Sequence, residues 1–172
     1  MSKPMVYLET SFFRYLIATP STDPRKADRQ RITRDWWQDS RHKYDLCVSK
    51  TVFDEFCEIG DGKISPEEAA ARLVLLQQAE LLIQERAILE MAALLVVPRR
   101  PLPVKAGADA LHWAVAAYYG CEFVLTWNFK HLNNASIKRR AERIIREYGY
   151  ESPTLCSPEE LEGIDDLGGD DV

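Results

Sequence analysis

Four acidic or amide side chains lie in separate parts of the chain, close to the expected ends of strands or the start of a helix. They are Glu9, Glu55, Asp109 and Asn128. Carboxylate and amide oxygens are hard ligands that suit Mg²⁺ or Mn²⁺. A divalent cation held by such oxygens can activate water and neutralise charge that develops on a phosphodiester. These residues therefore indicate metal-assisted hydrolysis, provided that the fold brings them together.

The hydroxyl groups beside these residues strengthen the same interpretation. Glu9 follows an apolar run and is followed by Thr10 and Ser11, and Thr126 precedes Asn128 by two residues. Burying a carboxylate beside a strand is costly unless the carboxylate faces a polar crevice. Glu9 is therefore expected to face a polar crevice.

Two of the acids have simpler explanations. The chain holds 27 Asp and Glu residues, so several carboxylates near strand ends are expected by chance. Glu55 could be an exposed helix acid, and Asp109 could stabilise the first turn of a helix through the helix dipole. Both alternatives stay open at the level of sequence.

Short apolar runs alternate with helical patterns along the chain, which predicts an α/β fold. The expected strands cover residues 5–8, 45–49, 81–83, 123–126 and 154–156. The expected helices begin near Pro24, near Phe53, at Pro66, near Glu85, near Gly107 and near Ser136, with capping boxes at residues 65–68 and 157–160. Strands separated by helices form a mostly parallel sheet, whose ligand crevice lies beyond the carboxyl ends of its strands.

Length and composition fit one domain over residues 1–162, followed by an acidic tail over residues 163–172 that is expected to be flexible. The chain has 172 residues, 46% of them hydrophobic, and its apolar runs are too short to cross a membrane. The first residues do not show the basic segment and long apolar stretch that are typical of an export signal, so we expect a cytoplasmic protein. The net charge of −5 argues against a long nonspecific nucleic-acid surface but allows a local basic rim.

The remaining conspicuous residues have less specific patterns. His112 and His131 are expected to be structural, and the four cysteines, which form no Cys-x-x-Cys pair, are expected in the core. Trp127, next to Asn128, could stack a base. Trp36 and Trp37 are adjacent and are not expected to face one core together, which suggests a surface for a second copy or a protein partner. Several basic residues flank the expected crevice in sequence, and each could contact phosphate or be an ordinary surface charge. They are Arg14, Arg99, Arg100, Lys105, Lys130 and those of a basic helix over residues 136–148.

Four segments together resemble the motif blocks of PIN domains, with the VapC-like ribonucleases of toxin-antitoxin systems as the nearest likeness. The segments are VYLETSFF (residues 6–13), SKTVFDEF (residues 49–56), ADALHWAVA (residues 108–116) and VLTWNFKHL (residues 124–132). The resemblance implies a three-layer sandwich with a parallel sheet of strand order 3-2-1-4-5 between helices. It also implies Mg²⁺- or Mn²⁺-dependent cleavage of RNA, a homodimer and an antitoxin partner.

Carried over by motif, the resemblance makes Glu9, Glu55 and Asp109 metal ligands and places Asn128 at the fourth acidic position. It assigns Thr10, Ser11 and Thr126 to positions that orient ligands, water or phosphate. PIN domains usually have Asp where this chain has Glu9, and Asn128 removes one negative charge. We therefore expect one firmly bound cation and a second that binds weakly.

The leading hypothesis is thus a metal-dependent endoribonuclease that hydrolyses RNA phosphodiester bonds, as the toxin of a type II toxin-antitoxin system. Asn128 favours the alternative of a catalytically weakened PIN-like module that binds RNA or a protein partner. Chemistry on DNA flaps or small phosphate esters, and nucleotide binding without a glycine-rich phosphate loop, receive little support.

Overall fold

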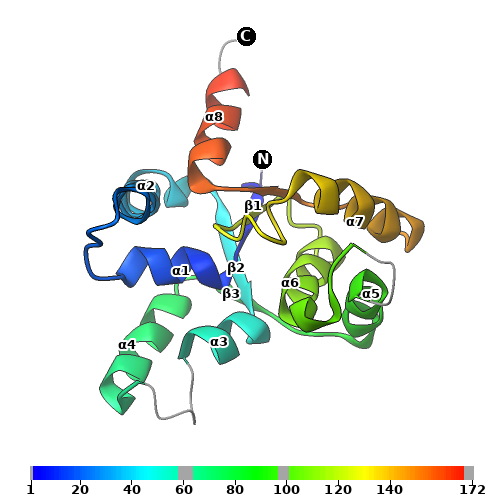
Figure 1. Ribbon diagram of the computed structural model, residues 1–172, viewed down its shortest axis with the longest axis horizontal. Helices are drawn as coiled ribbons and strands as arrows, with labels where there is room; N and C mark the ends of the chain where they lie inside the picture. Colours follow the sequence, from blue (N-terminus) through cyan, green and yellow to red (C-terminus); the bar gives the residue numbers. More distant parts are fainter. Residues whose placement is uncertain (1, 58–63, 97–100, 169–172) are drawn as a thin grey trace.

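Five short strands form one parallel sheet in the order β3-β2-β1-β4-β5, in a computed structural model that describes residues 2–57, 64–96 and 101–168 (Figure 1). The strands are β1 (Met5–Leu8), β2 (Asp45–Ser49), β3 (Glu80–Leu82), β4 (Phe123–Leu125) and β5 (Thr154–Cys156). The predicted strand order is confirmed. β3 begins one residue earlier than expected and β4 ends one residue earlier, which is an ordinary uncertainty at strand ends.

Helices cover both faces of the sheet, so the expected three-layer arrangement is confirmed (Figure 1). The helices are α1 (Thr10–Ile17), α2 (Pro24–Asp39), α3 (Lys50–Cys57), α4 (Pro66–Leu76), α5 (Arg86–Val96), α6 (Gly107–Tyr118), α7 (Ala135–Glu147) and α8 (Pro158–Gly168), with short 3₁₀ turns η1 (Arg41–Lys43) and η2 (Val104–Ala106). In Figure 1, α1 and α2 lie on one side of the sheet and α5, α6 and α7 lie on the other.

The register of the central strands brings remote residues to one edge. β1 lies between β2 and β4, and Leu8 is opposite Leu125. The backbone N–H of Glu9 continues this pairing by donating to the Leu125 carbonyl at 3.1 Å. Glu9 and Thr126, which directly follow the two strands, therefore lie side by side at the carboxyl edge of the sheet.

Helix α1 is an element that sequence analysis did not predict. Glu9 is its N-cap, and its inward face buries Phe12 and Phe13 completely. A carboxylate that accepts a hydrogen bond from a first-turn N–H stabilises the start of a helix. Glu9 thus follows the last residue of β1, and its side chain caps α1 while lying at the edge of the sheet.

The expectation that Trp36 and Trp37 cannot both face the core is wrong. Both are buried, and both rings contact Phe12, at centroid distances of 5.5 Å and 6.0 Å respectively. The Arg41 guanidinium covers the Trp37 ring at 4.5 Å. Because α1 and α2 pack closely, one aromatic cluster is wide enough to receive two neighbouring positions of α2.

The core predictions for the cysteines are confirmed. Cys47, Cys57, Cys121 and Cys156 are buried free thiols. Among the described residues, no helix has the length and apolar character needed to cross a membrane.

Both predicted capping signals mark helix starts, at α4 and α8, and the reciprocal pair of bonds that defines a capping box is seen at α8. Ser65 accepts a hydrogen bond from the Glu68 N–H at 3.1 Å. At α8, the Ser157 hydroxyl accepts from the Glu160 N–H at 3.2 Å, while the Glu160 carboxylate accepts from the Ser157 N–H at 2.7 Å. Helix α8 then continues through Gly163 to Gly168, so the expected boundary after residue 162 falls inside this helix, and residues 169–172 lie outside the described part.

The Glu160 carboxylate should stabilise the fold in a pH-dependent way. Burial alone would raise the pKa of Glu160, but hydrogen bonds from Ser157 and Asn133 outweigh burial and lower it. We expect Glu160→Gln to lower the free energy of unfolding by about 0.5–1 kcal/mol at pH 7, the usual size of a capping interaction. Because the folded-state pKa is depressed, the difference is full above the unfolded pKa of about 4.3 and shrinks as pH falls through the folded pKa.

Urea denaturation of the wild type and of two variants at pH 7 and pH 3 measures this effect. Glu159→Gln is the matched control, because it removes a charge from the same first turn without touching the Ser157 hydrogen bonds. Equal losses in both variants, or a Glu160→Gln loss that persists undiminished at pH 3, would contradict the assigned role.

Candidate metal centre

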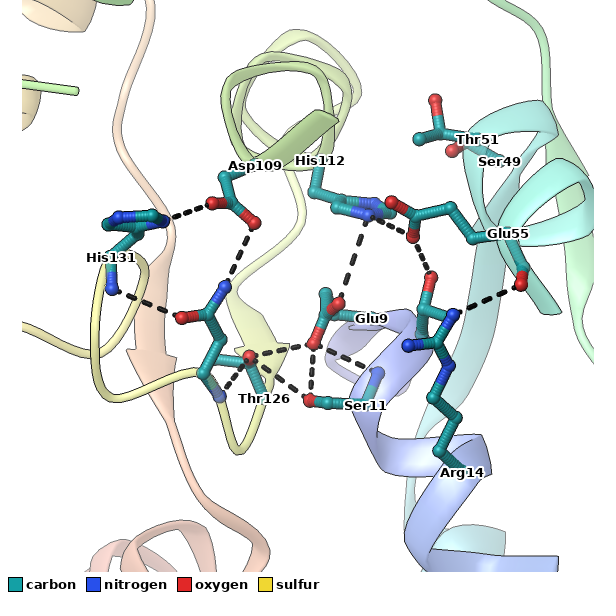
Figure 2. A network of polar contacts seen from close by, with 12 residues as sticks. Glu9, Ser11, Arg14, Ser49, Thr51, Glu55, Asp109, His112, Thr126 and His131 are labelled. Carbon is teal, nitrogen blue, oxygen red and sulfur yellow. Dashed lines mark hydrogen bonds and ion pairs between the residues drawn. The ribbon is translucent and has the colours of Figure 1, made fainter. Parts of the chain in front are cut away.

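Glu9 is a buried carboxylate whose Oε2 atom is fully engaged by neighbouring donors. Its side chain accepts hydrogen bonds from the Ser11 N–H at 3.1 Å, from the Thr126 hydroxyl at 2.8 Å and from the Ser11 hydroxyl. The residue is 5% exposed. These donors hold the carboxylate in place, with Oε1 facing His112 at 3.8 Å from Nε2 (Figure 2).

Glu55 reaches the same point from α3, which begins directly after β2. Its Oε2 atom lies 3.0 Å from His112 Nε2 and accepts a hydrogen bond from the Thr10 hydroxyl. Burial tends to raise the pKa of Glu55, but the hydrogen bonds and charge from His112 and the Thr10 hydroxyl outweigh burial, so the pKa is lowered. The carboxylate is therefore held in its ionised, metal-binding form, and the exposed-helix explanation is wrong for this residue.

His112 is the site residue that sequence analysis undervalued. Its ring is completely buried, with Nε2 facing both carboxylates and Nδ1 at 2.7 Å from the Tyr7 hydroxyl. The Tyr7 hydroxyl in turn lies 2.7 Å from Ser49 Oγ. Contacts on both ring nitrogens fix the imidazole, a recurring feature of histidines that bind metals.

The surroundings of His112 and Tyr7 raise the pKa of both side chains. Burial alone would lower the pKa of His112, but the Glu55 hydrogen bond and the charges of Glu9, Glu55 and Asp109 raise it. Burial raises the pKa of Tyr7 well above its ordinary value, so its hydroxyl keeps its proton. The nearby carboxylates thus stabilise the protonated form of the imidazole.

The donor set of Glu9, Glu55 and His112 fits a divalent cation. One ligand atom from each residue lies within 4.8 Å of the other two, in a largely buried position. Two carboxylate oxygens and one imidazole nitrogen are a normal ligand combination for a divalent metal. Buried carboxylates that face one another also need a positive charge between them.

Asp109 belongs to a second polar group beside this cluster. Its Oδ1 atom accepts from the Asn128 amide at 2.9 Å, and its Oδ2 atom lies 2.6 Å from His131 Nδ1. The Asn128 amide oxygen also accepts from the His131 N–H at 3.1 Å. The structure thus places Glu9 and Glu55 together at His112, whereas Asp109 contacts Asn128 and His131 in a neighbouring group.

The three predicted hydroxyls all contact the site, and two of them connect its halves. Thr126 Oγ1 donates to Glu9 and accepts from the Asn128 N–H at 3.0 Å. Ser11 Oγ donates to Glu9 and accepts from the Trp127 N–H at 2.8 Å. The loop after β4 is therefore tied to the Glu9 carboxylate.

The predicted cations around the crevice are only partly placed. Arg14 Nη2 donates to the Glu55 backbone carbonyl at 3.2 Å, which places its charge beside the cluster (Figure 2). Lys105 and Lys130 are exposed. Arg99 and Arg100 lie outside the described residues.

Comparison with known proteins supports the assignment of the fold. The family model described as "PIN domain" matches residues 6–136. A search of curated proteins finds no match. Among solved structures, Mycobacterium tuberculosis VapC20, described as a sarcin-ricin loop cleaving toxin, is similar with a TM-score of 0.59 and 14% identity, over 76% of this chain and 95% of that one.

The family match spans all the residues of the two polar groups, from Glu9 to His131. It covers most of the chain, and the strand order of the structure agrees with it. The chain therefore belongs to the PIN-domain family.

Proposed function

We propose that this protein is a metal-dependent endoribonuclease that hydrolyses RNA phosphodiester bonds. The observation that carries the proposal is the convergence of Glu9, Glu55 and His112 at the carboxyl edge of a PIN-type sheet, with ligand atoms within 4.8 Å of one another. A bound Mg²⁺ or Mn²⁺ ion would supply charge neutralisation and water activation at the phosphodiester.

The residues of the chain would divide the work by position. Glu9 and Glu55 would hold the cation, with His112 Nε2 as a third ligand. Asp109 would complete the outer side of the site through water or after releasing Asn128 or His131. Thr10, Ser11 and Thr126 keep the carboxylates oriented, and their hydrogen bonds support that role.

Asn128 is compatible with an active site. Its amide donates to Asp109 at 2.9 Å and its oxygen accepts from His131 at 3.1 Å, so both ends of the amide are used. A carboxylate at this position would place a second negative charge against Asp109. This geometry supports a positioning role for Asn128, and it weakens the main argument for a module that only binds RNA or a protein.

The biological setting follows from the family by analogy. VapC20 is described as a toxin that cleaves the sarcin-ricin loop. We propose that this chain is likewise the toxin of a type II toxin-antitoxin system, active in the cytoplasm on an RNA target. A homodimer and an antitoxin protein partner complete this proposal.

Removal of one carboxylate should weaken both metal binding and cleavage strongly. We expect Glu55→Gln to weaken Mn²⁺ binding, measured by calorimetry, by about 100-fold or more, since loss even of an outer-shell partner typically costs 10–100-fold. Cleavage of a labelled RNA should fall by a similar factor or more. Wild type should show one tight Mn²⁺ site, with any second site much weaker.

Asp54→Asn is the matched control for this prediction. Asp54 neighbours Glu55 on α3, but its carboxylate is exposed and pairs with Lys50 at 2.5 Å. Metal affinity and cleavage should be unchanged in this variant. Full Mn²⁺ binding and cleavage in Glu55→Gln would refute the assigned site, whereas tight metal binding without cleavage of any RNA by the wild type would favour the inactive alternative.

The imidazole should be visible as a nitrogen ligand. Mg²⁺ strongly prefers oxygen ligands, so a centre that includes His112 Nε2 should bind Mn²⁺ more tightly than Mg²⁺. Electron spin-echo spectroscopy of the Mn²⁺ complex should show coupling to ¹⁴N in the wild type and in His131→Gln. The coupling should disappear in His112→Gln, and its absence from the wild type would exclude His112 as a ligand.

A further inference from the structure

A separate pocket of about 260 Å³ lies next to the loop that follows β4. Arg25, Asp28, Arg29 and Ile32 of helix α2 line one part of it, Trp127 and Phe129 line another, and Glu159 of α8 completes the lining. Pockets for drug-sized ligands usually measure about 300–1,000 Å³, so this one suits a single planar group.

Phe129 presents the open aromatic surface of this pocket. Phe129 is 40% exposed, which is unusual for a phenylalanine beside a buried aromatic cluster. Trp127 is only 7% exposed, and its indole N–H donates to Thr33 at 2.9 Å. The Trp127 ring packs edge-on against the Phe129 ring, with centroids 6.0 Å apart. Phe129 therefore replaces Trp127 as the candidate for base stacking.

Arg29, on helix α2, is held among three aromatic rings, those of Tyr15, Trp127 and Phe129. Its guanidinium carbon lies 4.9 Å from the Phe129 centroid and 5.4 Å from the Trp127 centroid, and Nη1 donates to the Tyr15 hydroxyl at 3.3 Å. Guanidinium planes stack on aromatic rings and on bases. Arg29 thus adds a second, positively charged planar surface beside the phenyl ring, already fixed before any ligand arrives.

The charges of the pocket favour a base over a free anion. Arg25 and Arg29 are offset by Glu159 and by Asp28, whose Oδ1 atom also pairs with Arg31 at 2.7 Å, so a phosphate inside the pocket would meet a carboxylate. Carboxylates instead accept hydrogen bonds from amino groups, which adenine, guanine and cytosine carry. The Arg25 side chain, which is exposed, is suited to the phosphate that follows such a base.

The pocket is connected to the metal centre through one short loop. Trp127 and Phe129 flank Asn128, the residue whose amide binds Asp109. The Trp127 N–H also donates to Ser11 Oγ, which binds Glu9. Because consecutive Cα atoms are about 3.8 Å apart, the loop places the pocket wall within one or two nucleotides of the candidate centre.

Resting on the proposed cleavage of RNA, we propose that this pocket binds one unpaired base of the RNA substrate. The base stacks on Phe129 beside the Arg29 guanidinium and directs its amino group towards Glu159 or Asp28. The pocket would then set which phosphodiester of a single-stranded segment reaches the metal centre.

Binding of two fluorescein-labelled octamers in EDTA tests this proposal without any cleavage. One probe is oligoadenylate, and the other is the matching abasic octamer with the same phosphates. Stacking is worth about 1–3 kcal/mol per base, so the wild type should bind oligoadenylate roughly tenfold more tightly. Phe129→Ala and Arg29→Gln should each reduce this preference to near one, while affinity for the abasic probe changes little.

Leu89→Ala, on the distant helix α5, is the control for loss of an exposed apolar side chain, and it should keep the full preference. Glu55→Gln should keep it too, since metal is absent from the assay. Equal affinity of the wild type for both probes, or an unchanged preference in Phe129→Ala, would overturn the pocket assignment while leaving the metal centre and RNA cleavage standing. Failure of the wild type to bind either octamer would instead count against both RNA proposals, and circular dichroism verifies that each variant is folded.

Discussion

The structure depends on the stabilisation of two carboxylates that are drawn together at the edge of a buried parallel sheet. Glu9 is 5% exposed, and its Oε2 atom accepts from Ser11 and Thr126, while its other oxygen faces His112. A buried carboxylate without such partners would cost several kcal/mol. The hydroxyls that follow β1 and β4 and the imidazole from α6 are therefore needed to keep these carboxylates stable and in position to bind a cation.

The orientation of His112 links this site to the centre of the sheet. The Tyr7 hydroxyl connects the imidazole to Ser49, so residues of β1, β2 and α6 share one hydrogen-bonded chain. The Tyr7, Ser49 and His112 side chains of this hydrogen-bonded series are completely buried, which leaves little freedom for the imidazole ring to turn. The metal centre is thus positioned by packing as much as by its own polar contacts, in keeping with the rule that precise sites rest on rigid elements.

Much of this arrangement could be predicted from sequence because it follows local patterns. The apolar run before Glu9, the hydroxyls that follow it and the N-caps at Ser65 and Ser157 are all short-range signals, and the structure confirms them. The strand order came from the likeness of four segments to PIN domains. That likeness also placed Glu9 and Glu55 at one edge of the sheet.

Sequence analysis missed three features, for different physical reasons. Asp109 and His131 are 22 residues apart, and their contact requires the irregular loop after β4. Helix α1 lacks a usual start signal, because its N-cap is Glu9 and not one of the Ser, Thr, Asp or Asn residues that helices prefer at this position. His112 lies three residues after Asp109 on one face of α6, and this spacing was the available signal that it points towards the same crevice.

The central claim is that Glu9, Glu55 and His112 together bind a divalent cation. Anomalous diffraction from a crystal grown with Mn²⁺ tests the claim most directly, because it locates the ion without reference to activity. The account predicts a strong peak within bonding distance of a Glu9 oxygen, a Glu55 oxygen and His112 Nε2. A peak bound by Asp109 and remote from those three atoms, or no peak at saturating Mn²⁺, would contradict it.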